Sequence, residues 1–249
     1  MENSFLGHVA EELLAKYGHD LRSICIVMPN RRAAQFLYKE LANRNNNKPI
    51  WAPVIKTSVQ LLREYSKLLN ADRLVLLNEL FKIHTTITGR VEPLHKFFPW
   101  GEILLADFND IDKYRVPAQI LYTNLSAEKE ITLDFSYLTE KQLEAIRLFW
   151  GEFAANEKDA KAAFTEIWQN LFPIYDTFRN TLLEAGIGYE GMIYRDAADK
   201  IGKNWVQGQF KEYVLVGFNQ LDSCERELFD TIITRENQFL LGLRPTLRK

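Results

Sequence analysis

The chain has 249 residues, of which 47% are hydrophobic, 26% charged and 12% aromatic, and its formal net charge is −2. This composition is typical of a globular protein that buries a sizeable core in one large or two small domains. A net charge near zero excludes binding to nucleic acid through overall charge, so any such contact must come from a local basic patch.

The first residues and the two cysteines favour a cytoplasmic protein without membrane contact. The segment "MENSFLGHVAEELLAKYG" lacks a basic n-region and a long apolar core, so it predicts an amphipathic helix and no signal peptide. No stretch approaches the roughly 20 apolar residues of a membrane span. Cys25 lies in a predicted strand and Cys224 at a predicted helix start, which indicates neither a disulfide framework nor a zinc site.

The first part of the chain alternates helix and strand. Apolar residues from Phe5 to Leu14 predict a helix that ends near Gly18. The run Ile24–Met28 is apolar throughout, as in a parallel strand covered on both faces. Pro29 should end this strand, and Asn30 should cap the next helix.

That next helix is expected to turn one face to the core, and an exposed loop over residues 43–49 should follow it. A second strand is predicted over residues 50–57, with Thr57 or Ser58 capping a third helix. The expected core positions of these two helices are Ala33, Phe36, Leu37 and Leu41, and Val59, Leu62, Tyr65 and Leu69.

Residues from about 72 to 199 are predicted to be mostly helical. The capping-box form "TEKQ" at 139–142 opens one helix, Pro173 should kink a long one, and Gly186 should end that long helix. The apolar stripes are Leu74, Leu77, Leu80 and Phe81; Ile103, Leu104, Phe108 and Ile111; Leu143, Ile146, Phe149, Trp150 and Phe153; and Phe164, Ile167, Trp168, Leu171, Tyr175, Phe178 and Leu182.

The α/β pattern then resumes with strands over 212–218 and 238–243 and a helix over 222–233. We therefore expect an α/β fold in which a helical block is inserted between strands of one parallel sheet. The predicted boundaries are 1–71 and 206–249 for the α/β part and 72–205 for the insertion. Because the chain stops on "RPTLRK" soon after the last strand, we expect it to be part of a larger protein.

Neither of two common nucleotide-binding motifs is established by the sequence. "GIGYEG" at 186–191 fits the dinucleotide pattern, but a helix precedes it where the motif requires a strand, so a helix end followed by a turn is favoured. No G-x-x-x-x-G-K-[ST] loop exists, and Val216 and Gly217 end the strand where an NTPase carries its Mg²⁺ carboxylate. Asp222 comes too late, in the cap of the following helix.

The remaining acidic and histidine residues do not indicate a catalytic or metal site. "DFNDIDKY" contributes Asp107, Asp110 and Asp112; a metal or nuclease site is one interpretation, and a solvated acidic face is favoured over it. His8, His19, His84 and His95 form no pair at metal-ligand spacing. We find no nucleophile–base arrangement above chance.

The turn "PNRR" is the best candidate for function. Arg31 and Arg32 lie in the first helical turn, where cations oppose the helix dipole and helix formation alone favours acidic residues. Backbone N–H groups and two guanidinium forks suit phosphate oxygens. The alternative is that both arginines pair with acidic neighbours or reach water.

The segments "ICIVMPNRRAAQFLYKEL", "VIKTSVQLLREY", "PWGEILLADFNDIDKY", "GYEGMIYRDAADKI" and "EYVLVGFNQLDSCERELF", in this order, resemble the N-terminal part of the B subunit of AddAB (RexAB)-type helicase–nucleases, in a Bacteroidetes-type branch. The resemblance extends over most of the chain. It implies a RecA-like 1A domain with an all-helical 1B insertion, in an inactivated superfamily-1 helicase whose PD-(D/E)XK, RecB-like nuclease domain lies further downstream.

The resemblance also implies that Val216 and Gly217 occupy the motif II position, where an active helicase carries Asp-Glu. The first hypothesis is therefore a non-catalytic, cofactor-free, DNA-binding domain of a DNA end-processing exonuclease in double-strand break repair and recombination. It would bind single-stranded or forked DNA through Asn30, Arg31 and Arg32, with Trp51 and Trp100 as candidates for stacking on bases.

Two alternatives stay open. The domain is a scaffold that docks a catalytic helicase–nuclease subunit without touching DNA, or it is a nucleotide enzyme with an unrecognised site.

Overall fold

The structure is a computed structural model that describes residues 4–46, 48–90, 93–127, 157–206, 209–236 and 238–241. Contacts along the chain divide it into two units. The α/β unit contains residues up to 67 and from 196 onward, and the helical unit is the continuous segment 68–195. The sequence placed these two boundaries after residues 71 and 205. The second division falls inside one helix, α9 (Glu190–Asn204).

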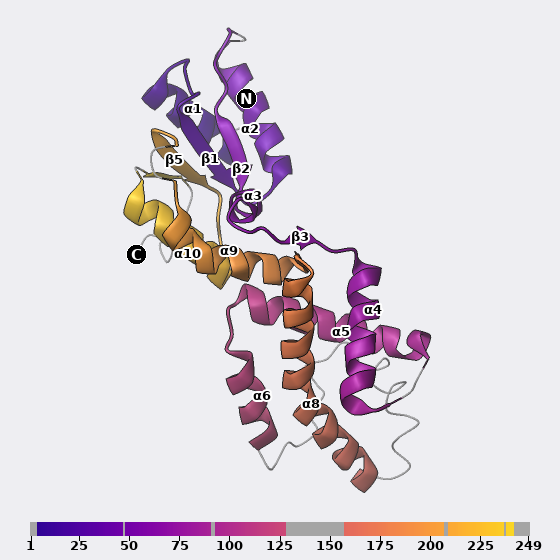
Figure 1. The fold of residues 1–249 in the computed structure, drawn as a ribbon. Coiled ribbons are helices and arrows are strands. Elements are labelled where there is room, and N and C mark those ends of the chain that lie inside the picture. Colours follow the sequence, from indigo (N-terminus) through magenta and orange to yellow (C-terminus); the bar gives the residue numbers. More distant parts are fainter. Residues whose placement is uncertain are drawn as a thin grey trace. The chain divides into compact units, whose positions relative to one another are not determined.

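The α/β unit contains a parallel sheet in the order β2-β1-β5-β6, so the expected α/β class with a parallel sheet is confirmed. Figure 1 labels β2, β1 and β5 of this sheet. The strands are β1 (Ile24–Met28), β2 (Val54–Thr57), β5 (Glu212–Val216) and β6 (Gln238–Leu241). Ile26 is paired with Ile55 on one side and with Val214 on the other. Because all four strands run the same way, their carboxyl ends lie at one edge of the sheet.

Both faces of β1 are covered, as its unbroken apolar sequence predicts. One face packs against α1 (Phe5–Tyr17) and α2 (Arg31–Arg44). On the other face of the sheet, Cys25 of β1 is paired with Tyr213 of β5, whose ring lies 5.6 Å from the ring of Trp205. The core on the first face is made of Val9, Ala10, Leu13, Leu21, Ile24, Ile26, Met28, Leu37, Leu41, Val214 and Val216.

Side-chain caps fix the helix starts of this unit. Asn30 Oδ1 accepts from the N–H of Ala33 at 2.8 Å, which confirms the predicted cap of α2. Thr57 forms a capping box at α3 (Ser58–Arg63), and Asp222 forms one at α10 (Ser223–Arg235). The segments that follow β1, β2 and β5 therefore begin as helices at the carboxyl edge of the sheet.

Several predicted details of this unit are wrong. The second strand begins at Val54, directly after Pro53, which has no N–H for a ladder. The third helix ends at Arg63, so it does not carry Tyr65 or Leu69. Phe36 is 51% exposed, because Leu37 and Leu41 already fill the core-facing side of α2. Strand β5 ends at Val216 instead of continuing to 218.

Within the predicted loop, Asn45 is buried and its side-chain amide donates to the Lys48 carbonyl at 2.9 Å. The predicted exposed loop over 43–49 is therefore wrong at Asn45, and also at its start, because α2 continues to Arg44. The amide closes the turn that follows α2.

The helical unit packs around an aromatic core. Phe108 lies 5.1 Å from Tyr175 edge-on, and Trp100 is buried in the same cluster. Leu104, Phe108 and Ile111 are buried as predicted, whereas Leu74 is 65% exposed. The described elements are β3 (Leu69–Asn70), α4 (Arg73–Thr88), α5 (Leu94–Lys113), α6 (Ala118–Ala127), α8 (Glu157–Glu184), β4 (Ile187–Gly188) and the start of α9. The helix predicted from "TEKQ" lies outside the described residues.

The sequence "GIGYEG" begins at a helix end, as its context indicates, and then continues into β4 (Ile187–Gly188) and the start of α9. Gly186 follows α8 with φ 68°, a conformation that glycine adopts without a steric penalty. Ile187 and Gly188 then pair with β3, and α9 begins at Glu190. A helix precedes the motif, so the arrangement of a dinucleotide site is not present here.

Candidate nucleic-acid interface

The turn between β1 and α2 presents two cations at a helix N-terminus. Asn30 is extended, with φ −152°, and Arg31 and Arg32 are the first two residues of α2. Both arginines are exposed, and the first turn of α2 has no acidic residue. Within the described residues neither arginine has a hydrogen-bond or ion-pair partner. The positive end of the helix dipole and two exposed guanidinium groups therefore lie within the first turn of one helix.

The register of the sheet brings this turn to the same edge as Val216 and Gly217, at the end of β5. Met28, at the end of β1, is paired with Thr57, and Val27 is paired with Leu215 one residue before Val216. The edge outside the carboxyl ends of parallel strands is where open α/β sheets bind ligands. The structure therefore brings Asn30, Arg31 and Arg32 to one edge with Val216 and Gly217.

The start of α10 at this edge differs from that of α2. Its first turn holds the carboxylate of Glu225, which accepts a hydrogen bond of 2.6 Å from Ser58 Oγ. The Asp222 carboxylate accepts from the N–H of Glu225 at 2.7 Å. Because carboxylates already stabilise this helix end, an anion is favoured at the start of α2 instead.

Neither Val216 nor Gly217 could be replaced by an acidic residue without an energetic cost. Val216 is fully buried in the core beneath α1 and α2. Gly217 has φ 76°, and a Cβ there would lie 3.5 Å from Phe5 Cε1. A charged side chain at residue 216 would be placed among apolar groups, which is strongly unfavourable without a partner.

The two tryptophans proposed for base stacking are not at this edge. Trp51 is 60% exposed, but it precedes β2 and is bridged to Asp20 at the opposite end of the sheet. The Arg22 guanidinium lies over its ring at 4.4 Å and binds the Asp20 carboxylate, which lowers the Asp20 pKa to about 2. Trp100 is buried in the helical unit, so its assignment as a stacking residue is wrong.

The three acidic residues of "DFNDIDKY" differ in burial. Asp107 and Asp110 are exposed, but Asp112 is completely buried, so the expectation of a solvated face is wrong for Asp112. Its carboxylate accepts hydrogen bonds from Tyr175 Oη at 2.6 Å and from Tyr189 Oη. Sequence spacing does not reveal this, because the tyrosines lie 63 and 77 residues further along the chain.

Two arginines complete the surroundings of Asp112. Arg195 Nη1 donates to Asp112 Oδ1 at 3.0 Å and to the Val116 carbonyl at 3.2 Å, and Arg179 Nε stands 3.8 Å from the same Oδ1. Burial and the adjacent Asp112 charge raise the pKa of Tyr175 and of Tyr189. The cluster therefore joins α5, α8 and α9 through one buried carboxylate, and we interpret it as structural.

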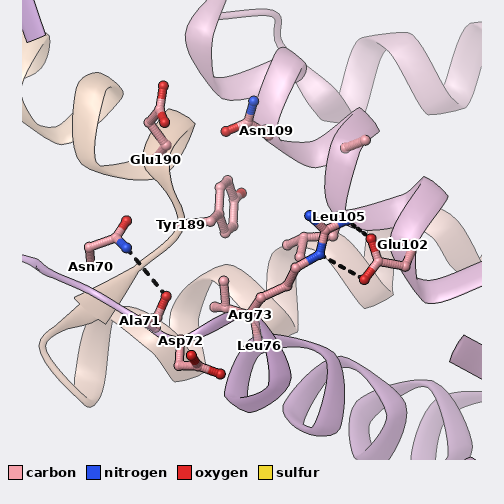
Figure 2. A pocket seen from close by; sticks show the side chains of 11 residues that line it. Asn70, Ala71, Asp72, Arg73, Leu76, Glu102, Leu105, Asn109, Tyr189 and Glu190 are labelled. Atoms are coloured by element: carbon pink, nitrogen blue, oxygen red, sulfur yellow. Dashed lines mark hydrogen bonds and ion pairs between the residues drawn. The ribbon is translucent and has the colours of Figure 1, made fainter.

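The helical unit also has a pocket of about 430 Å³ lined by β3, α4, α5 and the start of α9. Figure 2 shows Arg73 extended toward Glu102, which accepts from Arg73 Nε at 2.7 Å. Glu190 is paired with Lys113 at 2.8 Å, and Asn109 Oδ1 accepts from the Gly191 N–H. Because its charged groups already have protein partners, the pocket does not define a ligand.

The cysteines and histidines do not form a reactive site in the described part of the chain. Cys25 and Cys224 are both buried, and burial raises the pKa of the Cys25 thiol to about 12. No group of three or more His, Cys, Asp or Glu side chains could hold a metal ion among the described residues.

Comparison with known proteins identifies no family for this chain. Neither a protein-family model nor a curated protein matches the chain. Among the described helices, none combines the length and the apolar character needed to cross a membrane.

Proposed function

We propose that the chain is a non-catalytic, helicase-like domain that binds the nucleic-acid backbone at the β1–α2 turn. In this proposal it belongs to a DNA end-processing exonuclease of double-strand break repair and recombination. The observation that carries the proposal is the pair Arg31 and Arg32, exposed without a protein partner among the described residues, at a helix start without acidic residues.

The chemistry of this turn fits phosphate. Backbone N–H groups at a helix N-terminus and the helix dipole both favour an anion, and Asn30 already satisfies the N–H of Ala33 and orders the turn. Each guanidinium offers a planar fork that matches two phosphate oxygens. Contacts of this kind fix a protein on the backbone without reading sequence.

The resemblance to AddB-type proteins is supported by the order of the elements. The strand that ends in "PNRR" lies next to the strand of the motif II position, and a helical segment is inserted between them in the sequence. We propose that this is a RecA-like 1A sheet with a 1B-like insertion. Val216 and Gly217 replace the acidic pair, and the domain therefore contributes binding instead of ATP hydrolysis.

The test is binding of a labelled single-stranded oligonucleotide, measured by fluorescence anisotropy across a range of salt concentrations. Arg31→Ala with Arg32→Ala should weaken binding at low salt at least tenfold, since hydrogen bonds to charged groups are worth roughly 1.5–3 kcal/mol each. The slope of log K against log salt should fall by about 1.4, because a single-strand phosphate contact contributes about 0.7.

The matched control is Arg22→Ala with Arg63→Ala. Both residues are exposed on the α/β unit and outside the β1–α2 turn, so the same charge is removed elsewhere. The control pair should retain most of the affinity. An unchanged affinity and salt slope in the Arg31/Arg32 variant would contradict the proposal.

A second candidate is a scaffold that docks the catalytic helicase–nuclease subunit without DNA. The observation that favours it is the exposure of Leu69, Leu74 and Val75 around the start of α4, since large exposed apolar side chains close in sequence are typical of protein contacts. Capture of the partner subunit without DNA, lost in Leu69→Ser with Leu74→Ser, would support this function. Capture that is unaffected by these changes would remove it.

A further inference from the structure

The outer face of α2 carries a stripe of four exposed residues: Arg32, Phe36, Lys39 and Asn43. Residues three and four apart lie on the same side of a helix, so these four side chains follow one another along α2. The stripe begins in the candidate phosphate-binding turn and continues away from it. We call it the α2 stripe.

Phe36 is exposed although its helix is well anchored. On one flank, Arg44 is bonded to Glu11 of α1 at 2.8 Å, and on the other, Tyr38 Oη donates to the Pro53 carbonyl at 3.1 Å. Leu37 and Leu41 are fully buried beneath α2. The Phe36 ring is therefore held in solvent by a fixed helix, and among the described residues it has no ring or cation–π contact.

The stripe differs in charge from the rest of the chain. Helix α2 has four basic residues and one acidic residue, a formal charge of +3, whereas the whole chain has −2. The acidic residue, Glu40, is engaged by Arg44 at 3.5 Å. Within the described residues neither Arg32 nor Lys39 has a carboxylate partner, so both cations are available to an external anion.

We propose that Phe36 stacks on an unpaired base while Arg32 and Lys39 bind the phosphates beside it. The α2 stripe thereby selects single-stranded nucleic acid over duplex. This inference rests on the proposed function and extends it. A base exposes its ring face to an aromatic side chain only when it is unpaired and unstacked, and cations alternating with an aromatic ring are typical of single-strand binding surfaces.

The test compares the whole chain with its Phe36→Leu variant, which keeps an apolar side chain and removes the ring. Affinity for labelled oligo-dT should fall about 5- to 150-fold, the range for loss of one base–aromatic contact. Affinity for a blunt duplex and for polyphosphate should stay the same, as should the salt slope. Oligo-U is measured in parallel, because stacking alone does not distinguish DNA from RNA.

Phe98→Leu is the matched control, since Phe98 is also an exposed phenylalanine, in the helical unit. It should leave all affinities unchanged. Phe36→Trp should bind oligo-dT at least as tightly as the wild-type chain, and the added indole fluorescence should be quenched by oligo-dT but not by polyphosphate. Circular dichroism checks that each variant is folded.

The outcomes separate this inference from the proposed function. If Arg31→Ala with Arg32→Ala weakens binding but Phe36→Leu does not, the stacking role is overturned and the phosphate site stands. If Phe36→Leu weakens duplex and single-strand binding equally, selection for single strands is overturned. If the wild-type chain binds no nucleic acid at low salt, both proposals are overturned.

Discussion

His84 is a single residue whose burial should make stability depend on pH. It lies on α4 with the ring of Phe97 at 4.9 Å, and burial, with a smaller contribution from the charge of Arg90, lowers its pKa from 6.5 to about 4. The folded chain therefore keeps this imidazole neutral between these two pH values, while the unfolded chain takes up a proton below about pH 6.5.

Stability from this group is complete above pH 6.5 and is lost as the pH falls toward 4, by about 3 kcal/mol in total at 1.36 kcal/mol per pH unit. Urea unfolding at pH 7.5 and at pH 4.5, followed by tryptophan fluorescence, should show this loss. In His84→Gln the difference between the two pH values should be smaller by most of that amount. His95→Gln removes an exposed histidine and should match the wild-type chain.

At this scale the sequence predicted residues with local partners and missed those with distant partners. Asn30, Thr57 and Asp222 cap their helices through the N–H three residues further on, a spacing that a sequence pattern contains. The burial of Asp112 and the exposure of Phe36 depend on which segments pack on a helix. Periodicity places a residue on a face but does not say which face is covered.

The start of α9 approaches α5 so closely that only glycine fits. A Cβ on Gly191 would lie 2.2 Å from the carbonyl oxygen of Asn109, a backbone atom that cannot turn aside. Gly191→Ala should therefore destabilise the helical unit by about 1–3 kcal/mol or more. Thermal unfolding monitored by circular dichroism measures this.

Gly202 provides the comparison within the same helix. A Cβ there meets nothing within 4 Å, so Gly202→Ala should stabilise α9 by about 0.5–1 kcal/mol through helix propensity. Equal effects of the two substitutions would show that the close approach of α9 to α5 is wrong.

The Asp112 cluster joins helices that are distant in sequence, and its loss should be costly. Asp112→Ala leaves Arg195 and the tyrosine hydroxyls without their shared acceptor, so we expect a loss of about 3–5 kcal/mol, typical of breaking a buried charge pair. Asp110→Ala removes an exposed carboxylate on the same helix and should change stability by less than about 0.5 kcal/mol. Denaturant titration of both variants tests the difference.

Helices and strands were predicted best where local signals agree. Strand β1 and helices α1, α2 and α10 have apolar periodicity and capping residues that indicate the same bounds. The predicted third helix is six residues too long, because Tyr65 and Leu69 continue its apolar period. In the structure α3 ends at Arg63 and Leu69 begins β3. The pairing of β3 with β4 makes Leu69 a strand residue, and a local sequence pattern contains no information about this distant pairing.

For the whole molecule, the order of elements predicted the parallel sheet and the helical segment between its strands. The change from alternating strands and helices to helices alone marks that segment in the sequence. The strand order and the register, which bring the β1–α2 turn to one edge with Val216 and Gly217, required the structure. The sequence therefore predicted which residues belong to the candidate site but did not predict how they are arranged in space.

The inserted segment has a consequence for synthesis of the chain. Lys16 and Tyr17 are bonded to Glu212, and the Lys16 contact connects positions 196 residues apart. At roughly 5–20 residues per second, a ribosome makes β5 about ten to forty seconds after β1. During that interval the apolar strand Ile24–Met28 has no β5 partner, so the nascent chain should be a substrate for chaperones that bind extended hydrophobic segments.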